Sequence, residues 1–213
     1  MNPDILARIF TFLIFVAFTL VGILFARFRG KMGEWRVGQI LRHLPKKKYV
    51  TLNDLLLFNG SASSQIDHVV VSVYGVFVVE TKCIKGWIYG SEKSENWTKN
   101  MYGKKYQFRN PLLQNAGHVR ALRKATGTEL NGVPVIPVVV FSYACDLKVL
   151  VNSPVIYWGQ LKKFIREYQR PVMSEERVAA IAAMLRSLDH DSAADKKRHK
   201  KFAQRNAEYR FGR

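Results

Sequence analysis

Two apolar, β-branched runs separated by a short turn signal constrain the fold of this chain most strongly. The runs cover residues 66–73 and 76–83, and Tyr74 and Gly75 separate them. β-Branched residues favour strands, and a two-residue connection that contains glycine is typical of a β-hairpin. The sequence therefore predicts an antiparallel hairpin here.

Three charged residues, Asp67, Glu80 and Lys82, interrupt this hairpin. Charged groups among buried apolar residues are costly unless something compensates their charge. With the loop at residues 74–75, Asp67 lies opposite Lys82. Glu80 lies on the same face, because residues two apart along a strand share a face. The pattern predicts one face that carries two carboxylates and an ammonium group.

This charged face has two interpretations. Asp67 and Glu80 lie on a diagonal of ~7–8 Å, which a cation that binds both carboxylates can span. Two carboxylates with a few waters suit Mg²⁺, with Mn²⁺ as a substitute. In the alternative interpretation, Asp67 forms a salt bridge with Lys82, and Glu80 lies on a solvated face. The spacing alone leaves both open.

The remaining chain predicts a mixed α/β fold. Residues 133–141 are almost continuously apolar, which is typical of a strand covered on both faces, and residues 147–151 are a candidate neighbour. A sheet buried on both faces requires helices to cover it. Apolar residues at helical spacing predict helices at 111–124, 161–168 and 178–188, the last after Ser174 as N-cap. Further strands are expected at 49–58 and 86–90.

An uncharged apolar run covers residues 9–26. As a helix it is ~27 Å long, close to the thickness of the hydrocarbon core of a bilayer. Its length and the lack of a small-residue cleavage site favour an uncleaved transmembrane helix over a signal peptide. Basic residues gather on its C-terminal side, at Arg27, Arg29, Lys31 and Arg36. By the positive-inside rule, we expect a single-pass membrane protein with its C-terminal domain in the cytoplasm, and a short amphipathic helix at 33–44.

The chain of 213 residues carries 34 Lys and Arg against 16 Asp and Glu, a net charge of +18. This charge predicts a polyanionic partner, which is either nucleic acid or the anionic lipid headgroups of a membrane face. The hydrophobic content of 48% excludes a disordered chain. Two cysteines are too few for a disulfide scaffold or a four-cysteine zinc site.

Several short motifs occur in a recognisable order along residues 31–151. They are Gly33-Glu34, Leu52-Asn53-Asp54, Ser64-Gln65-Ile66-Asp67-His68, Val79-Glu80-Thr81-Lys82, Gly86, Trp97, Asn110-Pro111-Leu112-Leu113-Gln114-Asn115 and His118. In this order they resemble the NERD (nuclease-related) domain, which belongs with the PD-(D/E)XK nucleases. The resemblance implies a restriction-endonuclease-like fold, with a mixed sheet flanked by helices, here preceded by one transmembrane helix.

The resemblance also implies roles for single residues. Asp67 and Glu80 would ligate the metal, and Lys82 would be the catalytic lysine. Glu34 would complete the acidic cluster, and Gln114 would position DNA or the attacking water. The function implied is a membrane-anchored, metal-dependent nuclease that hydrolyses DNA phosphodiester bonds. The alternative is a catalytically silent membrane tether that binds DNA or a partner protein through the same fold.

Some neighbouring residues have structural interpretations. His68 points to the face opposite Asp67 by strand alternation, which predicts a structural role. His118 lies one helical turn after Gln114 and could approach the site. Ile66 stands where the family pattern has proline. A weak nucleic-acid signal comes from aromatic residues interleaved with basic ones, namely Trp87, Tyr89, Trp97, Tyr102, Tyr106 and Phe108 with Lys93, Lys99, Lys104, Lys105 and Arg109.

These features predict four segments. The transmembrane anchor covers residues 1–30 and the nuclease-like core covers 31–151. Two C-terminal helices complete the domain within 152–190. A basic tail follows at 191–213, as a solvated segment or a helix that orders on binding.

Overall fold

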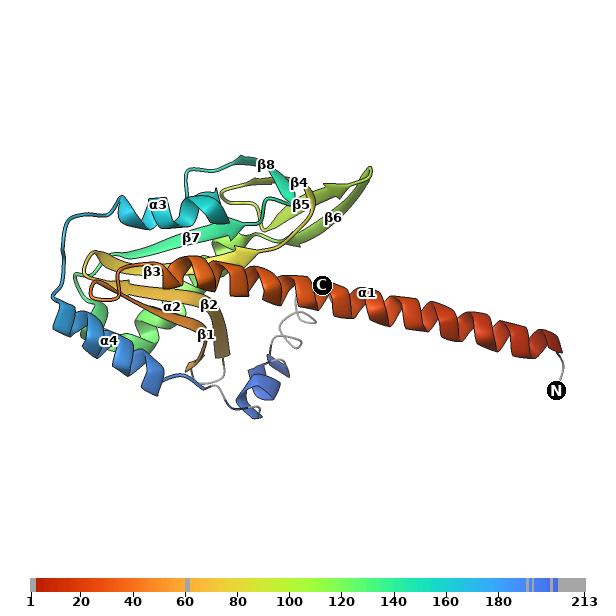
Figure 1. The fold of residues 1–213 in the computed structure, drawn as a ribbon, viewed down its shortest axis with the longest axis horizontal. Coiled ribbons are helices and arrows are strands. Elements are labelled where there is room, and N and C mark those ends of the chain that lie inside the picture. The colour runs from red at the N-terminus through yellow and green to blue at the C-terminus, as the bar shows by residue number, and fades with distance from the viewer. Residues whose placement is uncertain (1–2, 60–61, 191, 193, 200, 203–213) are drawn as a thin grey trace.

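The computed structural model describes residues 3–59, 62–190, 192, 194–199 and 201–202, without the side chains at positions 3, 6, 7, 23, 26, 27 and 59. The predicted helices and strands occur in the predicted order, except that the two expected N-terminal helices form one helix, α1, and that three strands, β5, β6 and β9, are added (Figure 1). The elements are α1 (Pro3–Arg42), β1 (Tyr49–Asn59), β2 (Ala62–Ser72), β3 (Gly75–Lys82), β4 (Gly86–Ser91), β5 (Asn96–Met101), β6 (Lys104–Arg109), α2 (Pro111–Thr126), η1 (Gly127–Leu130), β7 (Val135–Phe141), β8 (Cys145–Leu150), β9 (Val155–Tyr157), η2 (Trp158–Gln160), α3 (Leu161–Arg166) and α4 (Glu175–Ser187).

A five-stranded mixed sheet forms the centre of the domain. Its strand order is β1-β2-β3-β7-β9, antiparallel from β1 to β3 and parallel from β3 through β7 to β9. Four successive residues of β7, from Val138 to Phe141, are fully buried. The predicted strand with both faces covered is therefore confirmed.

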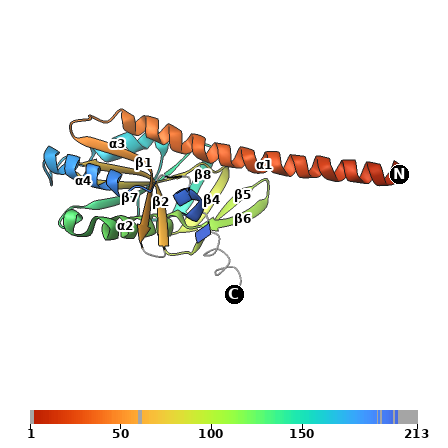
Figure 2. The same cartoon turned by 90° about the horizontal axis from the view of Figure 1, so that it is seen from below.

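Helices cover both faces of this sheet (Figures 1 and 2). On one face lie α1 and α3, and Phe77 of β3 belongs to the same apolar cluster as Leu161 of α3. On the other face lie α2 and α4, and Val78 joins Leu122 and Ile181 in a second cluster. Adjacent residues of β3 thus enter opposite layers, as the period of a strand requires. The mixed α/β fold with flanking helices is confirmed.

A second mixed sheet, with strand order β6-β5-β4-β8, packs beside the first. The joint is Trp97 of β5, which is fully buried and stacks on Phe141 of β7 with ring centroids 6.2 Å apart and planes at 9°. The indole N–H donates a hydrogen bond to the carbonyl of Ser91 at 3.0 Å. A Cβ at Gly90 would overlap the indole ring, so only glycine lets the ring lie flat on β4.

The hairpin loop lies one residue earlier than predicted. Ser72 pairs with Gly75, so residues 73–74 form the loop. Gly75 has a φ of +138°, and a Cβ there would lie 2.9 Å from the carbonyl oxygen of Pro134. The Ser72 hydroxyl donates a hydrogen bond to the Gly75 carbonyl at 2.8 Å. Glycine's freedom of φ therefore allows Gly75 to start β3 instead of completing the turn.

This register brings Asp67 next to Glu80. The paired residues of β2 and β3 end at His68 and Val79, and Asp67 and Glu80 are the next residues on the two strands. The predicted pairing of Asp67 with Lys82 is wrong. Moving the loop by one residue shifts the pairing of β2 with β3 by two residues. Because side chains alternate between the faces of a strand, Asp67 has a different partner but stays on the predicted face.

The N-terminal helix corrects a further prediction. The sequence predicts a membrane helix at residues 9–26 and a separate short helix at 33–44, whereas α1 runs without a break from Pro3 to Arg42. Its last turns bury Val37 and Leu41 in the core. Among the described residues, no helix has the length and apolarity needed to cross a membrane. This finding contradicts the predicted single-pass location with a cytoplasmic domain, and the predicted transmembrane anchor and bilayer contact through residues 9–26 lack support.

The C-terminal elements close the second helical layer. The side chain of Ser174 accepts a hydrogen bond from the Arg177 N–H at 3.3 Å, which confirms the predicted N-cap of α4. Residues 194–199 of the basic tail are helical, and Lys196 pairs with Asp54 at 3.0 Å. The rest of the predicted tail, residues 203–213, lies outside the described residues.

We expect Gly90→Ala to destabilise the domain, because the new methyl group must displace the Trp97 ring from the joint between the sheets. Overpacking of this kind costs ~1–3 kcal/mol, at about 2–4 °C of melting temperature per kcal/mol in a chain of this size. Thermal unfolding followed by circular dichroism measures the change. Gly117→Ala is the control, since a Cβ there meets only the Arg120 guanidinium at 3.8 Å. A melting temperature that does not fall in Gly90→Ala contradicts the packing described.

Candidate active site

The candidate site lies where β2 separates from β3. Pairing between β1 and β2 is continuous except at Asp54 and Asp67, and Asp54 has a φ of +57°. At this interruption, one carboxylate oxygen of Asp67 accepts a hydrogen bond from the backbone N–H of Thr81 in β3 at 2.7 Å. A carboxylate therefore takes the place of a backbone carbonyl at the point where the two strands diverge.

Glu80 and Lys82 project from β3 to the same side. The Lys82 ammonium donates hydrogen bonds to Glu80 Oε1 at 2.6 Å and to Gln114 Oε1 at 3.0 Å. The side chain of Glu80 is 2% exposed and that of Lys82 is 19% exposed. The predicted shared face of Glu80 and Lys82 is confirmed, whereas the alternative of a solvated Glu80 is wrong.

Helix α2 supplies the other wall of the site. Gln114 reaches Lys82 as described, and His118 lies one turn later with Nε2 at 3.1 Å from Glu80 Oε2. The Nδ1 atom of the same ring is 2.7 Å from the Ser64 hydroxyl. The spacing of Gln114 and His118 indicated a shared helix face. In the structure Gln114 contacts Lys82 and His118 contacts Glu80. Ser64 carried no signal beyond its position in the motif around Asp67.

Two asparagines hold α2 against both sheets. Asn110 caps the helix by accepting from the Leu112 N–H at 2.9 Å, and its amide donates to the Ser94 carbonyl at 2.7 Å. Buried Asn115 donates to the carbonyls of Val78 at 3.0 Å and Val138 at 3.1 Å. Because these bonds join α2 to β3 and β7, they determine where Gln114 and His118 meet the strand.

The electrostatic environment shifts the pKa values of Asp67 and Glu80 in opposite directions. Burial and the nearby Glu80 charge raise the pKa of Asp67 well above its ordinary value. Burial also acts to raise the pKa of Glu80, but the Lys82 ammonium and His118 outweigh it, so the net shift is downward. Glu80 is thus compensated by the protein, whereas Asp67 carries a charge that the protein compensates only in part.

Glu34 of α1 belongs to the same electrostatic cluster. Burial, then the charges of Asp54 and Glu80, raise the pKa of Glu34. The helix approaches closely here, because a Cβ at Gly33 would lie 2.9 Å from the Cβ of Cys83. The charges of Glu34, Asp67, Glu80 and Lys82 therefore act on one another at this end of β3.

The donor set suits a hard cation. Within the described part of the chain, no group of three or more histidine, cysteine, aspartate or glutamate side chains is placed to hold a metal ion. Asp67 and Glu80 still offer two carboxylates, and a divalent cation that keeps part of its water shell needs few protein ligands. The raised pKa of Asp67 indicates negative charge that such an ion would neutralise.

His68 takes the structural role that strand alternation predicts. Its Nδ1 is 2.8 Å from Asn53 Oδ1, and its ring faces Gly38 of α1. Burial lowers the pKa of His68 to about 4, so the ring is neutral at physiological pH. The ring lies between α1 and the sheet, away from the Lys82 contacts.

Comparison with known families gives the class of this chain, which is a nuclease-related protein. Residues 29–142 match the nuclease-related domain family, NERD, and the chain belongs to that family. An uncharacterized protein of Bacillus anthracis is 37% identical over 187 residues, which cover 83% of this chain and 87% of the relative. No solved structure matches the chain significantly. The predicted family is therefore confirmed.

We expect Asp67→Asn to stabilise the protein at neutral pH. The folded-state pKa of Asp67 lies above its ordinary 3.8, so the free energy of unfolding falls as the pH rises through that raised pKa. Asparagine keeps an acceptor for the Thr81 N–H and carries no charge. The variant should melt a few degrees higher than wild type at neutral pH, at about 2–4 °C per kcal/mol.

The two melting curves should converge once the pH falls below about 4, where the wild-type carboxyl is protonated in both states. Added Mg²⁺ should raise the melting temperature of wild type more than that of Asp67→Asn. Exposed Glu95, replaced by Gln, is the control and should follow wild type throughout. Wild type as stable as Asp67→Asn at neutral pH would show that the Asp67 carboxylate is already compensated.

Proposed function

We propose that this protein is a metal-dependent nuclease that hydrolyses DNA phosphodiester bonds with Mg²⁺, or with Mn²⁺ in its place. The observation that carries the proposal is the meeting of Asp67, Glu80, Lys82 and Gln114 at one end of β3 within a nuclease-related domain. Two carboxylates and a lysine, drawn together from neighbouring strands, supply a cation site beside a fixed positive charge.

Each side chain has a role that its contacts support. Asp67 and Glu80 would hold the ion, and Glu34 adds negative charge that favours the same cation. When bound, the ion lowers the pKa of the attacking water and neutralises charge that develops on the phosphate. The Lys82 ammonium, oriented by Gln114, stabilises negative charge in the transition state.

The contacts of Glu80 set a condition for ion binding. Lys82 occupies one carboxylate oxygen and His118 the other, at 2.6 and 3.1 Å. A cation at Glu80 therefore competes with at least one of these partners. Without its bond to Glu80, Lys82 would still donate to Gln114, which would hold its ammonium group at the site.

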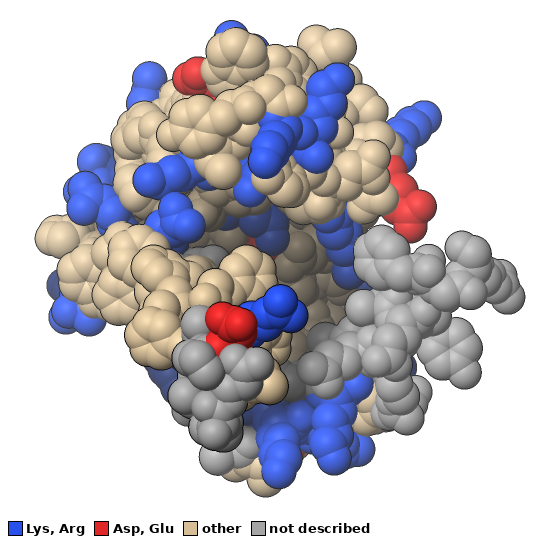
Figure 3. Space-filling view, turned by 90° about the vertical axis from the view of Figure 1, so that its right-hand side faces the viewer, with Lys and Arg blue, Asp and Glu red and all other residues tan. Residues whose placement is uncertain are grey.

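The charge of the chain suits a polyanion. Figure 3 shows one hollowed face of the molecule with Lys and Arg side chains around its rim and few acidic ones. The chain as a whole carries a net charge of +18, which would supply sequence-independent affinity for a phosphate backbone. Nucleic acid is therefore the partner that we propose.

A second candidate function is a catalytically silent domain that binds DNA or a partner protein through the same fold. It is favoured by the occupied oxygens of Glu80, and by the lack of a three-residue metal-ligand group among the described residues. Cleavage assays separate the two candidates.

We expect Glu80→Gln and Lys82→Met each to lower DNA cleavage by at least about 100-fold, the usual cost of removing one group that stabilises the transition state. The assay uses supercoiled, linear and single-stranded DNA with Mg²⁺ or Mn²⁺, and EDTA should abolish cleavage. Glu95→Gln and Lys148→Met, at exposed positions outside the site, are the matched controls. Wild-type cleavage in Glu80→Gln would refute the assigned site, and wild type without cleavage on any substrate would favour the silent domain.

A further inference from the structure

The exposed face of β4 carries aromatic side chains that the fold does not use. Trp87 is 51% exposed and Tyr89 is 40% exposed, whereas Ile88 between them is fully buried. Trp97 and Phe108 of the same sheet pack in its core, with ring centroids 6.4 Å apart. The interleaved aromatic pattern thus divides into core residues and a separate solvent-facing set.

Tyr102 at the tip of the β5–β6 hairpin is exposed at a conformational cost. Its side chain is 96% exposed and its φ is +52°, followed by Gly103 at +76°. Two successive positive φ values form the hairpin turn that favours Asn-Gly, and a tyrosine is unfavourable at the first position. A side chain that is 96% exposed gains little packing from the described residues to offset this strain, which points to a role outside the fold.

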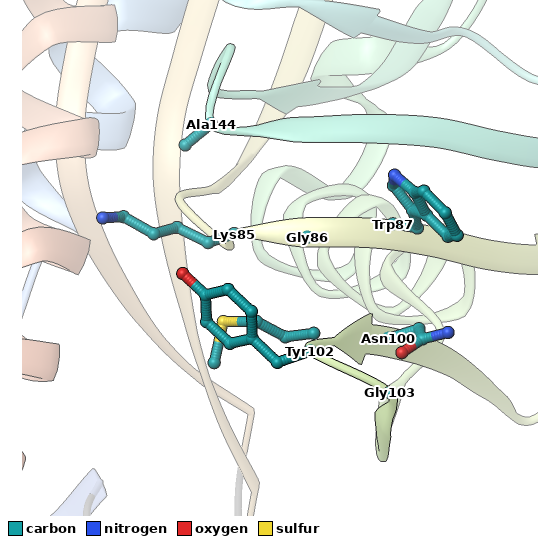
Figure 4. A pocket seen from close by; sticks show the side chains of 8 residues that line it. Lys85, Gly86, Trp87, Asn100, Tyr102, Gly103 and Ala144 are labelled. Carbon is teal, nitrogen blue, oxygen red and sulfur yellow. The ribbon is translucent and has the colours of Figure 1, made fainter.

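Trp87 and Tyr102 line a hollow of about 530 Å³, together with Lys85 and Gly86. Figure 4 shows Tyr102 beside the Lys85 side chain, and Trp87 on the other side of Gly86. Gly86 has a φ of +98°, and a Cβ there would overlap the carbonyl of Asn100. Only glycine therefore allows the backbones of β4 and β5 to approach this closely beside the hollow. The volume falls in the range of ~300–1,000 Å³ that is typical of sites for small organic groups.

The charges beside the hollow are mainly positive. Lys85 lines it, and cross-strand pairing places Trp87, Asn100 and Lys105 in one row across β4, β5 and β6. Lys104 follows the tip of the same hairpin. The acidic Asp146 lies on the opposite side of β4, so a polyanion is favoured along β5 and β6 rather than along β8.

The hollow is also close to the candidate active site. Lys85 is the third residue after Lys82, so their Cα atoms lie within about 11 Å along the chain. The backbone of Ser142 donates to the Lys82 carbonyl at 3.1 Å, and Gly86 donates to the Ala144 carbonyl at 3.3 Å. These two hydrogen bonds connect Gly86, which lines the hollow, through residues 142–144 to the end of β3.

We propose that this surface binds an unpaired stretch of the DNA substrate, with bases stacked on Trp87 and Tyr102 and phosphates near Lys85, Lys104 and Lys105. Stacking requires the open face of a base, which an intact duplex hides, so the surface selects single strands. The inference rests on the proposed function, in that the bound strand is the one led to Lys82.

Binding is measured on the full chain in EDTA, by fluorescence anisotropy of a labelled oligonucleotide and of its duplex. We expect Trp87→Ala and Tyr102→Asn each to weaken single-strand binding about 10-fold, the usual effect of losing one stacked base, with a much smaller effect on the duplex. Trp87→Phe and Tyr102→Phe keep a ring and should bind nearly as wild type.

Tyr102→Asn separates binding from folding. It creates Asn-Gly in the turn that favours this pair, so its melting temperature should equal or exceed that of wild type while its affinity falls. Wild-type affinity in both Trp87→Ala and Tyr102→Asn, or an equal loss for single strand and duplex, overturns the inference.

The two proposals fail in different ways. Glu95→Gln, at an exposed position outside both the active site and the stacking surface, should bind the single strand in EDTA as wild type does. Cleavage that persists in Glu80→Gln refutes the active site and leaves the binding result unaffected. Binding that is independent of Trp87 and Tyr102 refutes the surface and leaves the cleavage result unaffected.

Discussion

The buried ion pair between Lys82 and Glu80 is the interaction on which the candidate site depends. A carboxylate that is 2% exposed is costly unless a cation and hydrogen bonds compensate it, and Lys82 and His118 provide both. The same contacts occupy the oxygens that a metal ion would use. The protein therefore stabilises Glu80 by means of groups that an ion at this carboxylate would have to displace.

Helix α2 connects this balance to the rest of the fold. Asn110 attaches its first turn to the second sheet, and Asn115 attaches its middle to β3 and β7. Gln114 lies between them in sequence and meets Lys82. Because the attachments are hydrogen bonds from buried side chains to backbone carbonyls, the helix has little freedom to slide, and the site is held by packing that serves the core as well.

The hairpin shows which predictions a sequence supports. Glu80 and Lys82 share a face because they are two apart on one strand, and this depends on covalent spacing alone. Their partner across the hairpin depends on the loop, and a single glycine, Gly75, with a φ of +138°, moved it by one residue. The predicted face was therefore right and the predicted partner of Asp67 was wrong. The prediction of two separate N-terminal helices was wrong for a related reason, because no local signal ends α1 between residues 26 and 33.

The sequence by itself determined the family, the order of most elements and the shared face of Asp67, Glu80 and Lys82, because strand period, helix caps and motif spacing are local properties of the chain. Only the tertiary structure decided that Glu80 is buried, that His118 reaches it and that Ser64 contacts the other nitrogen of the His118 ring. Burial and such contacts depend on how α2 docks against β3, and the residues concerned lie up to 54 positions apart in the sequence.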